Sequence, residues 1–536
     1  MGPARTGSSL ARGAATITLA TGISRVTGFV RVMAVAAAMG TTFLANTYQT
    51  ANSIPNVVFE LVAAGVLTSV FVPTFVEHLV KGTREQGWRT ANTLGSVALT
   101  ALVGLALLVA LAAPLIMRIL TLGVEDAALR AREIALGSTF LRLFSPQLVF
   151  YGVGMIMTSA LHAHGRFGLA AAAPIFNNLV VTLVYLSYAA MRGGDAPSVG
   201  GITTAETLVL GAGTTLGVVA MTLSLLPGLR RLGWRARWMF EPRDDVVRKA
   251  ARLGVWALGY AGGYQAGLVL VLFLANRQEG GVAAYQWAYT FFYVPHALFG
   301  MPLFHVLFPA MSEDVAKGEA AGFERRLRDG LAMLAFVLAP VSIALVVTAQ
   351  PIARLTLEYG VMTRTGGELV ARVLAAFALG LPTYSAFLAL TRAFYARGDT
   401  KTPALINAAA VLLGGAAGAA LFFAVPEKWA VPGLAAGHSV GFAFGAVMLA
   451  VALARQGAAR FPGLVPVLAR TALVTALAGL VMVVVHRALP DASRGAALLN
   501  VVTTLGAGAI AYLAVTARTR SQELSRLRSL LLRARA

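Results

Sequence analysis

Long apolar stretches separated by short polar segments dominate the pattern along the 536 residues of this chain. A helix needs about 20 mostly apolar residues to cross a hydrocarbon core of roughly 30 Å, so each stretch predicts one membrane span. The pattern predicts fourteen spans: 13–40, 44–79, 91–117, 133–161, 168–191, 202–227, 250–275, 281–311, 329–349, 370–391, 402–425, 430–454, 466–486 and 496–516. The second is too long for a bilayer, so we expect it to tilt, to kink at Pro55 or to project into water.

Basic residues are distributed unevenly between the two sides that fourteen spans define. The N-terminus, the connections after even-numbered spans and the C-terminal tail hold 30 Lys or Arg, and the opposite side holds 11. The positive-inside rule therefore predicts that both termini are cytoplasmic. Arg25 and Arg31 interrupt the first apolar stretch, so we expect a permanent span there and not a cleaved signal peptide.

Composition agrees with a membrane protein and changes how the charge is interpreted. The chain is 57% hydrophobic and only 12% charged, with a mean hydropathy of +0.73, which excludes an ordinary soluble domain. The net charge of +21 would suggest nucleic acid in a soluble chain, but here the predicted cytoplasmic rim accounts for it, and no nucleic-acid partner is expected. The absence of cysteine excludes disulfides and thiolate metal sites.

A weak internal repeat predicts two similar halves. Pro174 and Asn178 follow an Ala-His-Gly-Arg segment, and Pro403 and Asn407 follow Ala-Arg-Gly-Asp. We therefore predict an all-α membrane protein of about 14 transmembrane helices, with two pseudo-symmetric six-helix lobes, two C-terminal helices and alternating access as the mechanism. The predicted divisions are a lobe at 1–227, a basic cytoplasmic linker at 228–249, a second lobe at 250–455, two helices at 456–516 and a basic amphipathic tail at 517–536.

Four charged residues are placed within predicted spans, namely Arg25, Arg31, Arg142 and Glu60. An arginine at a span centre costs roughly 2.5–3.5 kcal/mol, so these residues should face a wet cavity. A guanidinium suits phosphate, which favours an anionic headgroup at Arg25 and Arg31, and the alternative is a structural network with Glu60. Glu60 is expected to pair with an arginine, with cation coupling as its alternative, whereas Arg142 lines the cavity, snorkels or pairs.

Uncharged polar residues add candidate cavity walls. Asn46, Gln49, Asn52 and Asn56 give the second span a polar stripe, with interhelical hydrogen bonding as the alternative. His296, near Pro295, is expected to be a buried structural histidine and not a protonation switch. Three glycines inside the sixth span predict close helix packing: Gly211, Gly213 and Gly217. We find no Walker loop, nucleophile elbow or paired catalytic carboxylates, so the sequence indicates a transporter and not an enzyme.

The segment Ser-Arg-Val-Thr-Gly-Phe-Val-Arg at 24–31, with Ile-Pro-Asn at 54–56, Gly65 and Phe-Val-Pro at 71–73, resembles the MurJ/MviN lipid II flippases. That family belongs to the MOP superfamily, which also contains the MATE exporters. The resemblance implies a cavity between two lobes, lined by the first, second, seventh and eighth helices. It implies undecaprenyl-pyrophosphate-linked peptidoglycan precursor as substrate, and a lipid-tail groove formed by the last two helices.

Arg25 and Arg31 match the family's two first-helix arginines, which the resemblance implies would contact pyrophosphate. The other candidate substrate-binding residues are Ser24, Gly28, Asn52, Asn56, Glu60, Asn178, Gln286 and Thr290, and Asn407 is a loose candidate for a cation site. The chain departs from the family's pattern at four positions. Phe59 and Thr290 stand where many members carry arginine, and Val32 and Asn46 stand where many carry an acid.

The leading hypothesis is a flippase that turns lipid II from the inner to the outer leaflet of the bacterial cytoplasmic membrane. The alternatives are a flippase for another lipid-linked oligosaccharide, an ion-coupled MATE-like exporter and a non-transporting cell-wall scaffold. No cofactor is expected. A coupling cation, sodium or proton, or the membrane potential would supply the energy. The expected partners are the anionic lipid-linked precursor, the membrane and cell-wall synthesis proteins.

Overall fold

The computed structural model describes residues 7–62, 84–234, 237–244, 247–248, 262–263, 265–490, 493–519 and 523. These ranges form helices joined by turns and contain no strand. Eleven helices among them are long and apolar enough to cross a membrane, or twelve if one bent pair is a single span. The prediction of an all-α, multi-pass membrane protein is therefore confirmed. The two other predicted spans, 44–79 and 250–275, lie partly outside the described residues, as do the segment 71–73 and most of the tail after 519.

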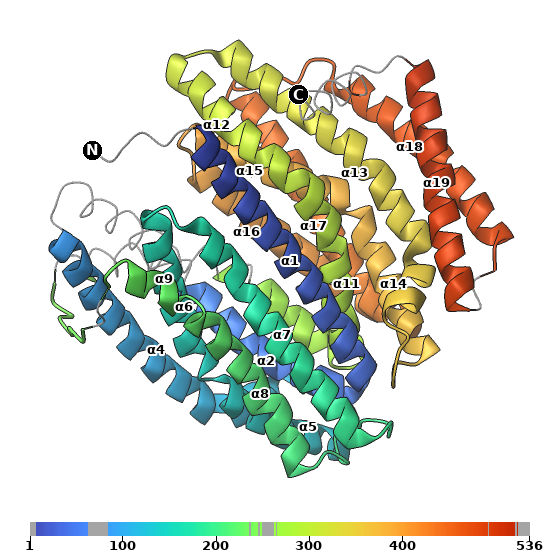
Figure 1. The fold of residues 1–536 in the computed structure, drawn as a ribbon. Helices are drawn as coiled ribbons and strands as arrows, with labels where there is room; N and C mark the ends of the chain where they lie inside the picture. The colour runs from blue at the N-terminus through green and yellow to red at the C-terminus, as the bar shows by residue number, and fades with distance from the viewer. Residues whose placement is uncertain are drawn as a thin grey trace. The chain divides into compact units, whose positions relative to one another are not determined.

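The first of two compact units comprises residues 1–283 and 359–362. Its described helices, blue to green in Figure 1, are α1 (Gly7–Met39), α2 (Phe43–Val62), α4 (Arg84–Leu120), α5 (Ala127–Phe144), α6 (Gln147–Ala163), α7 (Phe167–Arg192), α8 (Thr204–Leu223) and the short α9 (Leu226–Arg231). Helix α1 packs along α7, which in turn packs on α8. Helix α2 packs on α5 and α6. The candidate residues on α1, α2 and α7 thus belong to one packed body.

The second unit comprises residues 284–358 and 363–536. Its helices are α11 (Gly281–Pro295), which begins in the first unit, η2 (His296–Gly300), α12 (Met301–Lys317), α13 (Ala320–Thr356), α14 (Arg364–Leu379), α15 (Leu381–Ala396), α16 (Lys401–Ala424), α17 (Glu427–Arg455), α18 (Leu464–Ala488) and α19 (Arg494–Arg518). The last two, drawn in red, pack on each other and on α13 (Figure 1).

Three predicted single spans are broken in the structure. The span predicted at 133–161 is two helices, because α5 ends before Ser145 and Pro146, and proline lacks the amide proton that a helix interior needs. The span at 370–391 is α14 and α15, bent by 46° at Gly380. The span at 281–311 contains the π-helix η2, which follows Pro295 and widens the backbone for one turn. The sequence pattern therefore located the apolar stretches but not the breaks within them.

Glycine allows close helix packing, as predicted for the sixth span. A Cβ atom at Gly211 would collide with Leu143 of α5, and one at Gly213 would collide with Val184 of α7. In the second unit α16 and α17 approach backbone to backbone, where Gly418 and Gly437 meet. Because lipid tails are as apolar as leucine, such small residues supply association energy through van der Waals contact.

The sequence repeat has a counterpart in backbone geometry. Gly165 before α7 and Gly398 before α16 both adopt a left-handed conformation, with φ of 71° and 77°. In both turns the residue after the glycine donates its amide to a carbonyl five residues earlier, at Leu161 and at Phe394. The two halves of the chain therefore enter corresponding helices by the same turn.

A four-residue strap, Tyr359–Met362, belongs to the first unit although it follows α13 in the chain. The amide of Val361 donates to the carbonyl of Ala37 at 2.9 Å. Gly360 has a φ of 57°, and a Cβ atom there would collide with the carbonyl oxygen of Ala37. Backbone atoms therefore hold the strap against the end of α1.

Candidate functional site

The two first-helix arginines lie on the continuous helix α1 in different surroundings. Arg25 is exposed in the first unit, whereas Arg31 is half-buried. Residues six apart on a helix differ by about 120° in direction, which accounts for the contrast. Arg31 interacts electrostatically with Tyr48, Tyr151 and Tyr185. Arg25 and Arg31 therefore lie on two different sides of α1.

Tyrosine hydroxyls form a polar cluster in the unit beside Arg31. The Tyr48 hydroxyl lies 2.6 Å from Thr214 Oγ1 and 3.1 Å from the hydroxyl of Tyr185. The Tyr48 ring also packs edge-on against Phe140 and Phe144 of α5. This network connects α2, α5, α7 and α8 near Arg31.

Asn178 fastens α7 to α1 at the level of the candidate motif. Its Nδ2 donates to the carbonyl of Ser24 and to Thr27 Oγ1, both at 3.1 Å. Gly28 lies directly against this amide, and a Cβ atom added there would lie 3.4 Å from Nδ2. Ser24, Gly28 and Asn178 are thus brought together, as positioning residues for the helix that carries Arg25 and Arg31.

The polar residues of α2 have two different roles. Asn46 is fully buried: Nδ2 donates to the carbonyl of Gln278 at 2.8 Å, and Oδ1 accepts from the amide of Val282 at 3.0 Å. The prediction of a cavity wall was therefore wrong for Asn46, which instead caps the start of α11. Asn52 keeps a buried Oδ1 with no hydrogen-bond donor, and Asn56 is exposed, so these two residues retain polar groups for a ligand.

Glu60 does not pair with the arginines. Its side chain is exposed and forms no ion pair or hydrogen bond with any residue that the structure describes. The expected network of Glu60 with Arg25 and Arg31 was wrong among the described residues, where Glu60 lies exposed in the last described turn of α2. Arg142 is also exposed and has no ion pair within the described ranges. Phe59, which stands where the family pattern has an arginine, packs on Tyr151.

An intramembrane acid that the sequence reading missed lies in α5. Glu133 is fully buried, and Thr47 Oγ1 donates to its Oε1 at 3.1 Å. Its second oxygen, Oε2, has no hydrogen-bond partner. The predicted span began at Glu133, so the residue was assigned to the span's edge. Helix α5 begins earlier, at Ala127, because Asp126 accepts hydrogen bonds from its first amides.

The remaining candidates lie in the second unit. Gln286 and Thr290 are half-buried on α11, where the Thr290 hydroxyl donates to the carbonyl of Gln286. Asn407 is buried on α16. Before that helix, the amide of Thr402 donates to Asp399 and is the main cause of a lowered pKa of Asp399. The predicted cavity between the lobes stays a prediction.

His296 is buried at the π-helix, as expected. Its Nδ1 lies 2.8 Å from Ser385 Oγ, and its Nε2 has no partner. The rings of Phe304 and Tyr384 pack around it. Within the described residues no three histidine, aspartate or glutamate side chains are placed to hold a metal ion.

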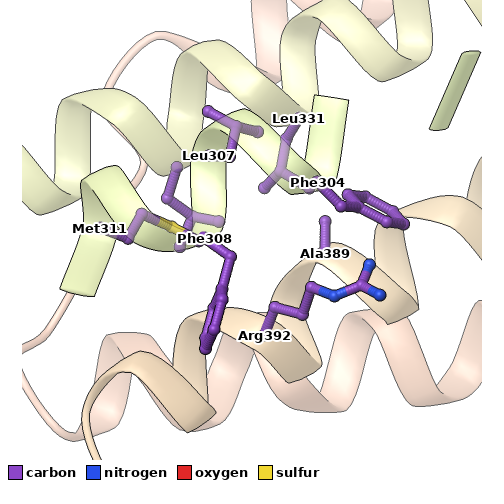
Figure 2. Close-up of a pocket in the computed structure, with 8 residues that line it drawn as sticks. Phe304, Leu307, Phe308, Met311, Leu331, Ala389 and Arg392 are labelled. Carbon is purple, nitrogen blue, oxygen red and sulfur yellow. The ribbon is translucent and has the colours of Figure 1, made fainter. Parts of the chain in front are cut away.

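A small apolar pocket in the second unit contains a further arginine. Figure 2 shows Arg392 extending toward Phe304, whose ring centroid lies 4.4 Å from the guanidinium carbon. The other lining residues are Leu307, Phe308, Met311, Leu327, Leu331 and Ala389. The sequence placed Arg392 in a loop after residue 391, but α15 continues to Ala396. An arginine above an aromatic ring is stabilised by a cation–π interaction.

Two solved structures have the same fold as this chain. A lipid II flippase MurJ in an inward-closed conformation superposes with a TM-score of 0.75 at 19% identity, covering 94% of this chain and 98% of that chain. An inward-facing MATE-family multidrug transporter superposes with a TM-score of 0.64 at 12% identity, covering 82% and 96%. This chain therefore shares the fold of these two solved structures.

Sequence comparison identifies the family. The family model described as lipid II flippase MurJ matches residues 35–503. A probable lipid II flippase MurJ of Rhizobium tropici is 30% identical over 438 residues, which cover 81% of this chain and 79% of the relative. Its counterpart in Rhizobium meliloti is 29% identical over 456 residues, covering 84% and 81%. The chain belongs to the MurJ lipid II flippase family, a family of transporters.

Proposed function

We propose that this chain moves lipid II, the undecaprenyl-pyrophosphate-linked peptidoglycan precursor, from the inner to the outer leaflet of the bacterial cytoplasmic membrane. One observation carries the proposal within this family. Helix α1 bears Arg25 and Arg31, and Asn178 of α7 bonds that helix at Ser24 and Thr27, on either side of Arg25. A guanidinium presents a rigid fork of donors that matches phosphate oxygens, so the pair suits a pyrophosphate.

The charge of these arginines fits an anionic cargo. Each guanidinium costs roughly 2.5–3.5 kcal/mol at a span centre, and a bound pyrophosphate offsets that cost. The polar atoms of Asn52 and Asn56 on α2 extend the surface that meets the headgroup. In this mechanism the lobes alternate between inward and outward access, both termini are cytoplasmic, and α18 and α19 carry the lipid tail.

The membrane potential is the simplest energy source for such a cargo. The interior of the cell is negative, so outward movement of an anion is favoured by about 2.3 kcal/mol per elementary charge at 100 mV. Two arginines that partly neutralise the pyrophosphate would reduce this driving force but would allow the headgroup to cross. A proton or sodium gradient is the alternative source.

The test is complementation of a strain depleted of its own flippase. The double variant Arg25→Ala, Arg31→Ala is expected to accumulate lipid II in the inner leaflet, measured with labelled precursor and a membrane-impermeant reagent. Arg118→Ala is the matched control, because it removes an exposed arginine of the same unit that is not a candidate for the cavity. Wild-type translocation by the double variant would refute the proposed role. Native mass spectrometry of the purified protein is expected to detect a copurifying lipid pyrophosphate.

A further inference from the structure

The buried carboxyl of Glu133 is a group that the proposed mechanism does not use. It lies in α5, fully shielded from solvent, and the described protein atoms approach only one of its oxygens with a donor. A charged carboxylate in such surroundings is strongly destabilised unless it is paired and fully hydrogen-bonded. Either a cation or a proton must therefore accompany it.

Among the described residues, no neighbouring charge forms an ion pair with Glu133. Helices α2, α4 and α8 pack against α5. These four helices carry eight other titratable or charged residues with described side chains. None of them forms an ion pair or hydrogen bond with Glu133: Tyr48, Glu60, Arg89, Arg118, Arg130, Arg132, Arg142 and Glu206. A hard metal ion takes about six or more oxygen ligands, whereas Glu133 belongs to no group of three His, Asp or Glu residues that could hold a metal ion in the described part of the chain. A proton fits the site better than a metal ion.

The geometry at Thr47 also favours a proton on Glu133. The Thr47 hydroxyl lies 2.8 Å from the carbonyl of Phe43 and 3.1 Å from Glu133 Oε1. A hydroxyl has only one proton to donate, and the shorter contact is the usual bond of a helical threonine to a carbonyl four residues earlier. A protonated Glu133 donates to Thr47 Oγ1 and thereby satisfies both contacts.

We propose that Glu133 is a proton-binding site, and that gain and loss of its proton alters the packing of α2 on α5 during transport. Helix α2 carries Asn52 and Asn56, which belong to the proposed headgroup surface, so a proton at Glu133 acts on the substrate site through the helix that also carries Thr47. The site itself rests on the geometry above, and its coupling to transport rests on the proposed function.

Infrared spectroscopy of the purified full-length protein tests the site directly. The carbonyl band of a protonated carboxylic acid is expected in the wild type, lost in Glu133→Gln and retained in Glu60→Gln. Thr47→Val keeps the side-chain size but removes the hydroxyl, and is expected to shift the band. A band that is absent from the wild type, or present in Glu133→Gln, would overturn the site.

Reconstituted vesicles test the coupling. Wild-type lipid II translocation is expected to change about tenfold per pH unit where one proton limits the rate, whereas Glu133→Gln is expected to vary less than about twofold over the same range. Equal pH profiles for the two proteins, both active, would overturn the coupling. A protein that shows the infrared pattern but moves no lipid II would refute the proposed function and leave the proton site standing.

Discussion

Replacement of Asn46 should destabilise the fold more than replacement of Asn56, the exposed asparagine of the same helix. Its side chain is fully buried and bonds both the carbonyl of Gln278 and the amide of Val282. That amide is one of the first four of α11, which have no acceptor within their own helix. A single side chain therefore bonds one half-buried and one buried backbone group, 232 and 236 residues away in the chain.

The magnitude follows from those two bonds. Asn46→Ala removes an N-cap, which costs about 0.5–2 kcal/mol, and one of two donors to the carbonyl of Gln278, which keeps its bond from the amide of Gly281, so this second loss costs about 0.5–1.5 kcal/mol. We expect a loss of roughly 1–3 kcal/mol in the free energy of unfolding. Asn46→Asp keeps the acceptor beside a positive helix end and loses only the donor, so we expect about half of that loss.

Two measurements check this prediction. Unfolding in mixed micelles gives the free energy of unfolding. Amide hydrogen exchange at Val282 shows whether its hydrogen bond to Asn46 is present. The control is Asn56→Ala, because Asn56 is exposed and its Nδ2 donates to the carbonyl of Asn52 in the same helix, so we expect a change within about 0.5 kcal/mol. If Asn46→Ala unfolds with the same free energy as this control and Val282 exchanges no faster, the assigned role of Asn46 is wrong.

Two further predictions use the same unfolding assay. A double-mutant cycle of Asn178→Ala with Thr27→Val should give a coupling energy of about 0.6 kcal/mol, typical of interhelical hydrogen bonds in membranes, and strict additivity would contradict the bond between them. Arg392→Ala should lose about 1–2 kcal/mol through the cation–π contact and packing, while Arg392→Leu should recover part of it because the pocket wall is apolar. Equal losses in the two variants would show that packing contributes nothing there.

Most of the helical architecture could be predicted from the sequence, because a chain in lipid must satisfy its backbone within each span and apolar length then defines the element. Close packing at Gly211 and burial of His296 also followed from local pattern. The breaks at Pro146 and at Gly380 did not, because the average hydropathy of a stretch is insensitive to a bend within it.

The candidate site was less accessible to prediction. Glu133 and Arg392 stand at the edges of apolar stretches, where a sequence pattern assigns charge to a loop, yet the helices continue past both residues. Asn46 was expected in a cavity wall because its acceptor and donor partners lie more than 200 residues away. Glu60 was expected to pair because charges in spans need partners, but pairing depends on distances that helical periodicity does not contain.

The strap at Tyr359–Met362 has a consequence for how tolerance to mutation would be measured in this chain. Val361 is held by its amide alone, so almost any side chain except proline should be accepted there. Substitutions at Gly360 should not be tolerated, because its left-handed conformation and the nearby carbonyl of Ala37 both exclude a Cβ atom. A saturation scan would therefore record one intolerant position beside a permissive one, and intolerance at Gly360 would reflect backbone geometry and not substrate contact.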